Sequence, residues 1–189
     1  MSIATTHQDQ GHFDRWSETY EHSLMQWLLF DRLHRAILKR LPISYFPTAI
    51  LDIGCGTGRL IRRMQACWPT ATFIGIDASE GMVSVAHNLT REATFYQASA
   101  EHFPLKATSV DLVTTTMSFH HWSDQAQGVS ETCRVLRQGG FFVLADTNIG
   151  HGSPLSRSQV RALFQASNLA LYSQASFIPY ITITIGEKA

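Results

Sequence analysis

Three glycines stand directly after a short apolar run that has the character of a buried strand. The run covers residues 49–53, and Gly54, Gly56 and Gly58 follow it at alternate positions, ahead of a segment with helical spacing. Glycine is needed where the backbone turns sharply or where a ligand approaches it without a Cβ in between. In an open α/β sheet this turn, at the carboxyl end of a strand, is where nucleotides bind. The glycines alone also fit a tight strand-to-helix turn.

A second feature supports the nucleotide site. Asp77 ends the next apolar run, 23 positions after Gly54. A carboxylate at that place can accept hydrogen bonds from both hydroxyls of a ribose. An acidic residue before a helix is also favoured by the helix macrodipole alone, without any ligand. The glycine loop and Asp77 together favour the binding of a nucleoside.

The position of the third glycine separates two nucleoside cofactors. The dinucleotide motif is G-x-G-x-x-G, and Arg59 stands where its third glycine would lie, whereas the third glycine here is Gly58. A pyrophosphate also benefits from a free helix N-terminus, and S-adenosylmethionine (SAM) carries no phosphate. The sequence therefore predicts SAM rather than NAD, with S-adenosylhomocysteine as the product of its use.

Alternating strands and helices must position this site. Apolar runs predict strands at residues 49–53, 72–76, 93–98, 110–116 and 141–146, with helices between them. We expect Ser79 to cap one helix and the glycine pair 139–140 to end the helix that follows Asp124. Two final runs, 169–176 and 180–185, are joined by so few residues that they must pair antiparallel. The expected fold is α/β: a Rossmann-like, doubly wound, mostly parallel seven-stranded sheet with an antiparallel C-terminal hairpin.

An amphipathic helix is expected ahead of the sheet, over residues 24–40. Its apolar face would carry Leu24, Trp27, Leu28, Leu33, Ile37 and Leu41. Its polar face would carry Asp31, Arg32, Arg35 and Lys39. We expect residues 1–44 to form an N-terminal helical lid segment and residues 45–189 to form the SAM-binding domain, within a single globular domain.

Composition excludes several classes of protein. Fifteen basic and fifteen acidic residues cancel, which disfavours a bulk nucleic-acid binder. The three cysteines have neither zinc-site nor redox-dithiol spacing, so we expect small buried side chains and no metal. No apolar stretch is long enough for a membrane span, and the polar first ten residues do not resemble a signal peptide. A cytoplasmic location is the resulting expectation.

Five segments carry a resemblance to a known family. They are LDIGCGTG, IGID, ASAEHFPL, DLVTTTMSFHHW and VLRQGGFFVLAD. In this order they resemble the motifs of class I SAM-dependent methyltransferases, most closely the group similar to the ubiquinone and menaquinone biosynthesis C-methyltransferases, with a methyltransferase type 11 domain. The resemblance covers roughly residues 45–147. It implies the cofactor and the fold, but not the substrate.

The resemblance also implies roles for individual residues. The three loop glycines would line the methionine and ribose portions of SAM, and Asp77 would hold the ribose. The other cofactor-binding residues implied are Asp52 beneath the loop, Ala78 and Met82 near adenine, Ser99 and Ala100 at the adenine edge, and Thr116 and Met117 at the methionine end. Ser99 stands where the family usually has an aspartate that contacts the adenine amino group. A serine hydroxyl or a backbone carbonyl could replace that hydrogen bond.

Methyl transfer makes modest demands on the protein, because the sulfonium already activates the methyl group. The protein mainly aligns the acceptor, and a general base helps only if the acceptor must lose a proton. His120 and His121 follow the fourth strand and are the candidate catalytic residues, although both could be structural. Neighbouring residues of an extended segment point opposite ways, so we expect at most one to face the acceptor. The other would pack with Trp122 or bond a backbone carbonyl.

The aromatic N-terminus has two interpretations. Trp16 and Tyr20 could pack in a core, or they could form a lid over the cofactor and substrate, as the resemblance suggests. The acceptor itself is expected to be a small molecule. A DNA amino-methyltransferase would carry a polar-Pro-Pro-aromatic motif where this chain has residues 116–119, Thr-Met-Ser-Phe. A SAM-binding sensor or partner subunit that does not methylate would keep the same cofactor motifs and stays open as an alternative.

Overall fold

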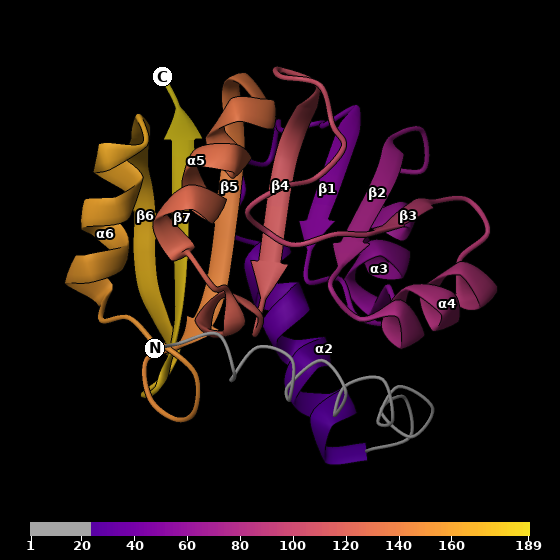
Figure 1. Ribbon diagram of the computed structural model, residues 1–189, viewed down its shortest axis with the longest axis horizontal. Helices are drawn as coiled ribbons and strands as arrows, with labels where there is room; N and C mark the ends of the chain where they lie inside the picture. The colour runs from indigo at the N-terminus through magenta and orange to yellow at the C-terminus, as the bar shows by residue number, and fades with distance from the viewer. Residues whose placement is uncertain (1–23) are drawn as a thin grey trace.

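A single seven-stranded sheet organises the chain in the computed structural model, which describes residues 24–189 (Figure 1). The strand order is β3-β2-β1-β4-β5-β7-β6. The strands are β1 (Ala49–Ile53), β2 (Thr72–Asp77), β3 (Thr94–Gln97), β4 (Val110–Thr116), β5 (Leu136–Thr147), β6 (Leu169–Ile178) and β7 (Ile181–Lys188). The helices are α2 (Leu24–Leu38), α3 (Arg59–Cys67), α4 (Glu80–Leu89), α5 (Gln125–Val135) and α6 (Arg157–Ala166), with a 3-10 turn η1 (Phe119–His121).

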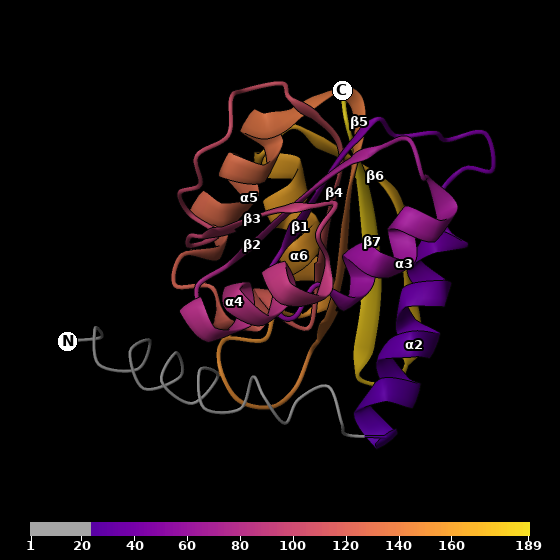
Figure 2. The same ribbon diagram turned by 90° about the vertical axis from the view of Figure 1, so that its right-hand side faces the viewer.

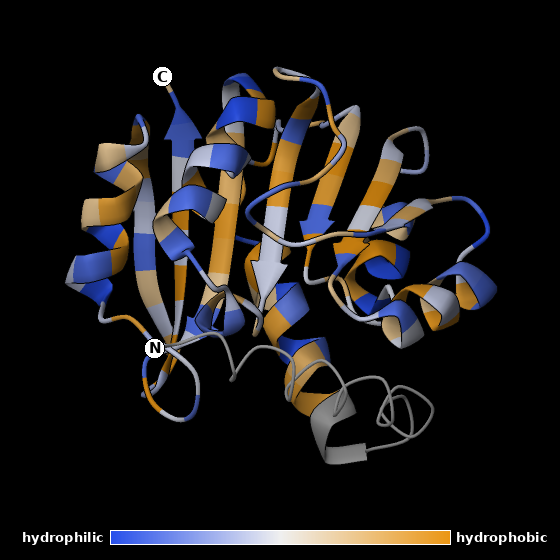
Figure 3. Cartoon of the chain, in the orientation of Figure 1, coloured by the Kyte–Doolittle hydropathy of each residue, from blue (hydrophilic) through white to orange (hydrophobic). Residues whose placement is uncertain are grey.

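The expected fold class is confirmed. Strands β1 to β5 pair in parallel, whereas β7 runs antiparallel to both β5 and β6. Strand β1 is buried along its whole length, as expected for a parallel strand covered on both faces. Figure 3 shows apolar residues concentrated on the central strands. The edge strand β6 has Ser173, Gln174 and Ser176 in its middle, and only Leu169 among its residues is fully buried.

Helices cover both faces of the sheet. Figure 2 shows α2 and α3 on one face and α5 and α6 on the other. The first face has one core cluster, to which α2 contributes Leu33 and Ile37 and α4 contributes Val83 and Ala86. The second face has another, built around Val129 of α5 and the aromatic side chains of η1 and α6. The carboxyl ends of β1, β2 and β4 reach the same edge of the sheet, where α2 passes (Figure 1).

Two helix starts agree with the sequence in detail. Ser79 caps α4 by accepting a hydrogen bond from the backbone N–H of Met82 at 3.1 Å. Ser156 and Gln159 form both bonds of a capping box at the start of α6. These local signals depend on residues three apart, so they could be identified without knowledge of the tertiary structure.

The prediction that glycines 139–140 end α5 is wrong. The helix ends at Val135, and the glycines lie inside β5, where Gly139 has a φ of 74°. The last carbonyls of α5 are satisfied by other parts of the chain. The N–H of Ser109 donates to the oxygen of Val135 at 2.8 Å, and Lys188 Nζ donates to the oxygen of Cys133 at 2.7 Å. Because these partners cap the helix, it needs no glycine at its end.

Two details of the expected α2 faces are also wrong. Asp31, assigned to the polar face, is only 6% exposed and forms ion pairs with Arg35 and with Arg63 of α3. Leu28, assigned to the apolar face, is 49% exposed. Arg63 of α3 provides the positive charge that allows the Asp31 carboxylate to be buried between the two helices.

The cysteines differ from one another, contrary to expectation. Cys55 is buried, but Cys67 at the end of α3 is exposed and Cys133 is partly exposed. Within residues 24–189, none of the helices is long and apolar enough to cross a bilayer.

Candidate functional site

The loop between β1 and α3 requires its glycines. Gly54, Gly56 and Gly58 all have positive φ angles, of 66°, 52° and 78°. A Cβ on Gly54 would lie 1.9 Å from Ser118 Oγ, so this glycine allows a close approach of the β4 end. A Cβ on Gly56 would meet no atom within 4 Å and would project into open space. The loop therefore packs against protein at Gly54 and presents bare backbone at Gly56.

Asp77 ties this loop to the end of β2. Its Oδ2 accepts the N–H of Gly56 at 2.8 Å, and its Oδ1 accepts the N–H of Ser79 at 2.9 Å. The carboxylate remains partly exposed. One acidic side chain thus fixes the glycine loop and the start of α4 while it faces the space between them.

Asp52 lies beneath the loop and is 1% exposed. Thr114 Oγ1 of the neighbouring strand β4 donates a hydrogen bond to Asp52 Oδ1 at 2.7 Å. Burial, together with the nearby charge of Asp77, raises the pKa of the Asp52 carboxyl to about 7 in spite of the hydrogen bond from Thr114, which lowers it. Asp52 is therefore a carboxyl group that can change its charge near neutral pH.

These groups surround a cavity of about 210 Å³ at the carboxyl edge of the sheet. Its lining contains most of the predicted cofactor residues: Asp52, Gly54, Gly56, Asp77, Ala78, Met82, Ser99, Ala100, Thr116 and Met117. Gly58 does not line the cavity; it precedes α3 and packs near the ring of Phe95. Segments distant in sequence are thus brought together as the sequence predicted, with Gly58 set back from the cavity.

Helix α2 contributes lining residues that were not predicted. Phe30 and His34 reach the cavity from α2, and Arg59 reaches it from the first turn of α3. His34 is 3% exposed, and its Nδ1 has no hydrogen-bond partner within residues 24–189. Burial and the charge of Arg59 lower the pKa of His34 to about 3, so its imidazole is neutral. The spacing of Phe30, His34, Ile37 and Leu41 follows one helical stripe, and this pattern could have identified His34 as inward-facing.

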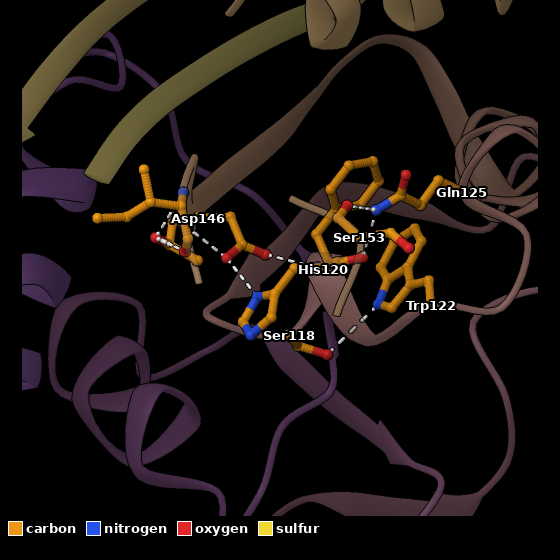
Figure 4. Close-up of polar contacts among 9 residues, drawn as sticks. Ser118, His120, Trp122, Gln125, Asp146 and Ser153 are labelled. Carbon is orange, nitrogen blue, oxygen red and sulfur yellow. Dashed lines mark hydrogen bonds and ion pairs between the residues drawn. The ribbon is translucent and has the colours of Figure 1, made fainter. Parts of the chain in front are cut away.

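The two candidate histidines differ in position. They lie in the 3-10 turn η1, not in an extended segment as expected, and their ring centroids are 4.0 Å apart. His121 lines the cavity and His120 does not. His120 Nδ1 lies 2.6 Å from Asp146 Oδ1, and its backbone N–H donates to Asp146 Oδ2 at 3.0 Å (Figure 4). The expectation that this histidine packs with Trp122 or bonds a carbonyl is wrong, because Asp146, one residue before the end of β5, places its carboxylate beside the ring.

The loop after β5 is attached to the same turn. The N–H of Ser153 donates to the oxygen of His120 at 2.8 Å. Gln125 Nε2 donates to the oxygens of Phe119 and Ser153 at 3.0 and 2.7 Å (Figure 4). Trp122 Nε1 donates to Ser118 Oγ at 3.3 Å, which joins the turn to the end of β4. Hydrogen bonds therefore hold η1, which forms one wall of the cavity, to the loop after β5 and to the end of β4.

Trp16 and Tyr20 lie outside the described residues, so their assignment to a lid stays a prediction. Glu101, Ser118 and Trp122 are further lining residues that were not predicted as site residues. Glu101 Oε1 also accepts the N–H of Asp124 at 3.0 Å, just before α5 begins.

Comparison with known families and proteins identifies relatives. Residues 51–144 match the family described as "Methyltransferase domain". The YcgJ protein of Bacillus subtilis, named an uncharacterized methyltransferase, is 37% identical over 106 residues, which is 51% of this chain and 40% of YcgJ. The demethylmenaquinone methyltransferase of Thermotoga maritima is 28% identical over 137 residues, which is 71% of this chain and 59% of that protein. The chain spans about half the length of the curated relatives it matches.

Solved structures show the same fold. A chain from the complex between the Haloferax volcanii Trm112 methyltransferase activator and a methyltransferase superimposes with a TM-score of 0.77. The two chains are 19% identical, and the match covers 93% of this chain and 97% of that one. At this identity the likeness concerns the fold alone.

Proposed function

We propose that the chain is a class I SAM-dependent methyltransferase that transfers a methyl group from SAM to a small-molecule acceptor, a proposal supported by the match of residues 51–144 to the methyltransferase domain family. The observation that carries the proposal is the bond between Asp77 and the N–H of Gly56 at the mouth of the cavity. This bond holds a bare backbone loop beside a partly exposed carboxylate. The nucleoside of SAM needs both features. The hydroxyls of its ribose need a hydrogen-bond acceptor such as a carboxylate, and its sulfur-linked chain needs a backbone without side chains that it can approach closely.

The donor set of the cavity fits SAM. Open space at Gly56 leaves room that any side chain there would fill. Asp77 would hold the ribose, and the apolar Ala78 and Met82 would flank the adenine, with Ser99 and Ala100 at its edge. Asp52 would lie below the methionine end, with Thr116 and Met117 beside it. Bound SAM would supply a methyl group already activated by the sulfonium.

The chain's own residues would then orient the acceptor and exclude water. Alignment of the two reactants can lower a barrier by about 7–11 kcal/mol in the best cases. His121 lines the cavity on η1 and would accept a proton from an acceptor that must lose one. His120, held by Asp146, would keep that turn in place.

Two observations support a small acceptor. The chain has fifteen basic and fifteen acidic residues and so offers no general attraction for polyanions. The Thermotoga relative is named for demethylmenaquinone, a small molecule. We further propose that residues 1–44, including Trp16 and Tyr20, form a lid over residues 45–189, and that the protein works in the cytoplasm.

An alternative function is a SAM-binding partner subunit or sensor that does not methylate. The Haloferax neighbour was solved with the Trm112 activator, and a protein partner of this chain would be consistent with that alternative. A nucleic-acid acceptor is the weaker alternative, because residues 116–119 lack the motif of the DNA amino-methyltransferases.

Methyl transfer from labelled SAM to a panel of small acceptors tests the proposal. We expect label in at least one quinone, acid or phenol of the panel. Binding of SAM without label in any small acceptor, protein or nucleic acid would favour the non-catalytic alternative. Binding of NAD in place of SAM would refute the assignment of the site.

A further inference from the structure

The cavity has an unassigned polar corner beneath α2. Phe30 and His34 project into it from α2, and Arg59 enters from the first turn of α3. Arg59 is the only lysine or arginine among the cavity residues in the described part of the chain. The carboxylates of the cavity come from other elements: Asp52 and Asp77 from the ends of β1 and β2, and Glu101 from the segment between β3 and β4.

The His34 imidazole is placed to bind a ligand. It is 3% exposed, yet its Nδ1 makes no hydrogen bond within residues 24–189. Buried polar atoms nearly always have a partner, so an unpartnered one beside a cavity points to a missing ligand or water. Phe30 packs against the ring with centroids 5.9 Å apart, and both side chains line the cavity.

The charges around His34 indicate which chemical group of a ligand would bind there. The charge that acts on the His34 imidazole is that of Arg59, whereas the charge that acts on the Asp52 carboxyl is that of Asp77. Arg59 brings a guanidinium to this corner, and the buried imidazole beside it is neutral, with a pKa of about 3. A neutral imidazole can donate one N–H, and a carboxylate is an acceptor that suits both this N–H and a guanidinium.

We propose that His34, together with Arg59, forms a subsite for a carboxylate of the bound ligand. The inference rests on the proposed function, since a SAM molecule in the cavity brings one carboxylate of its own. The acceptor is the second possible source of this group. His34 is in either case a binding residue that has not been assigned.

Binding measurements can separate the two sources. SAM and decarboxylated SAM differ only in the carboxylate, and calorimetry would compare both ligands on the full chain. We expect the wild type to bind SAM at least about 10-fold more tightly, the effect of one hydrogen bond to a charged group. His34→Leu should lose this preference, and His34→Asn should keep most of it, because an amide nitrogen can take the place of Nδ1.

His87→Leu is the matched control. His87 is an exposed histidine of α4 that does not line the cavity, so its replacement should leave the preference unchanged. Thermal melting without ligand would confirm that the His34 variants fold. Since Nδ1 has no partner, His34→Leu should melt close to the wild type.

Each remaining outcome has a defined meaning. If His34→Leu keeps the preference for SAM, the protein saturated with S-adenosylhomocysteine would be titrated with acetate, malonate and longer mono- and dicarboxylates. Binding by the wild type that is lost in His34→Leu would assign the subsite to the acceptor. No change in either experiment would overturn the subsite but leave the methyltransferase proposal intact. A wild type that binds neither SAM nor its decarboxylated form would overturn both.

Discussion

Asp146 holds His120 by two bonds, one to the ring and one to the backbone. The distance is 2.6 Å from Asp146 Oδ1 to His120 Nδ1, and the His120 N–H donates to the other carboxylate oxygen at 3.0 Å. Asp146 lies near the end of β5 and is itself buried. The carboxylate of Asp146 therefore anchors η1 to the sheet. The next residue, His121, lines the cavity. The two histidines should have different functions in spite of their adjacency.

Replacement of His121 by alanine tests its function as a base. We expect kcat to fall by about 10²–10⁴-fold, the usual contribution of a general base, with SAM affinity nearly unchanged. Initial rates on an acceptor found by the labelling assay, together with calorimetry, would measure both quantities.

His120→Asn serves as the comparison, because an amide can still donate to Asp146 and keep the turn anchored. It should retain most of kcat, whereas His120→Ala should lower both kcat and the melting temperature. A near-normal kcat in His121→Ala would mean that catalysis is positioning alone.

Replacement of Asp77 by asparagine should weaken the binding of S-adenosylhomocysteine by about 1.5–3 kcal/mol, the scale of hydrogen bonds to a charged group. The variant loses the charge that holds Gly56 and would hold the ribose. Isothermal calorimetry would measure the change. Asp124→Asn is the control, since Asp124 caps α5 without lining the cavity and asparagine caps equally well. Equal affinities in the two variants would contradict a ribose-binding function of Asp77.

Much of the fold could be predicted because its signals are local. Each of the seven expected strands exists, since apolar runs bounded by glycine, proline or polar residues mark buried strands. The end of α5 was mispredicted because its partners, Ser109 and Lys188, are distant in sequence. The burial of Asp31 likewise depends on Arg63 of another helix. Errors occurred where a tertiary partner replaced a local signal.

The set of residues that meet at the cavity could likewise be predicted in part. The glycine loop and Asp77 belong to a compact motif, and the fold brings them together at one sheet edge. Asp146 was missed, because nothing in the sequence indicates that the end of β5 meets the turn after β4. His34 is absent from the prediction because the buried face of α2 was assigned from apolar residues alone, although the helical stripe of Phe30, Ile37 and Leu41 includes it.

Asp52 should make stability depend on pH. Burial raises the pKa of this carboxyl from 3.8 to about 7, so between about pH 4 and 7 the folded state binds more protons than the unfolded state. The free energy of unfolding then falls as the pH rises through this range. Each pKa unit corresponds to about 1.4 kcal/mol, so the effect should reach a few kcal/mol.

Urea unfolding of the wild type and of Asp52→Asn at pH 5 and pH 8 would measure this effect. Asparagine cannot ionise but can still accept the hydrogen bond of Thr114. The variant should therefore gain stability relative to the wild type at pH 8, with a smaller gain at pH 5. Parallel pH profiles for the two proteins would show that Asp52 does not titrate in this range.

Deletion of residues 1–22 tests the lid. The described core begins with α2, whose Leu33 and Ile37 are fully buried, so the shortened protein should remain folded. It should lose turnover if Trp16 and Tyr20 close over the substrate. Thermal melting would check folding, and the labelling assay would check activity. Full turnover by the shortened protein would refute a lid in this segment.

The two loop glycines Gly54 and Gly56 should respond differently to alanine. Both have positive φ angles, so a Cβ costs about 1–2 kcal/mol of backbone strain at either position. At Gly54 the Cβ would also lie 1.9 Å from Ser118 Oγ, and overpacking of this kind costs about 1–3 kcal/mol more. At Gly56 the Cβ would meet no protein atom within 4 Å and would enter the space proposed for SAM. Gly54→Ala should therefore mainly lower stability, whereas Gly56→Ala should mainly lower SAM affinity.

Chemical denaturation and calorimetry on both variants would separate these effects. The double variant Gly54→Ala/Ser118→Gly removes the atoms that the new Cβ would strike, so it should be more stable than the sum of the two single changes predicts. Gly56→Ala combined with Ser118→Gly should show no such coupling, because the Cβ at residue 56 does not approach Ser118. Similar losses of stability in the two alanine variants, with unchanged SAM affinity in Gly56→Ala, would mean that the loop tolerates a side chain where the cofactor is proposed to bind. The glycines would then serve the turn alone.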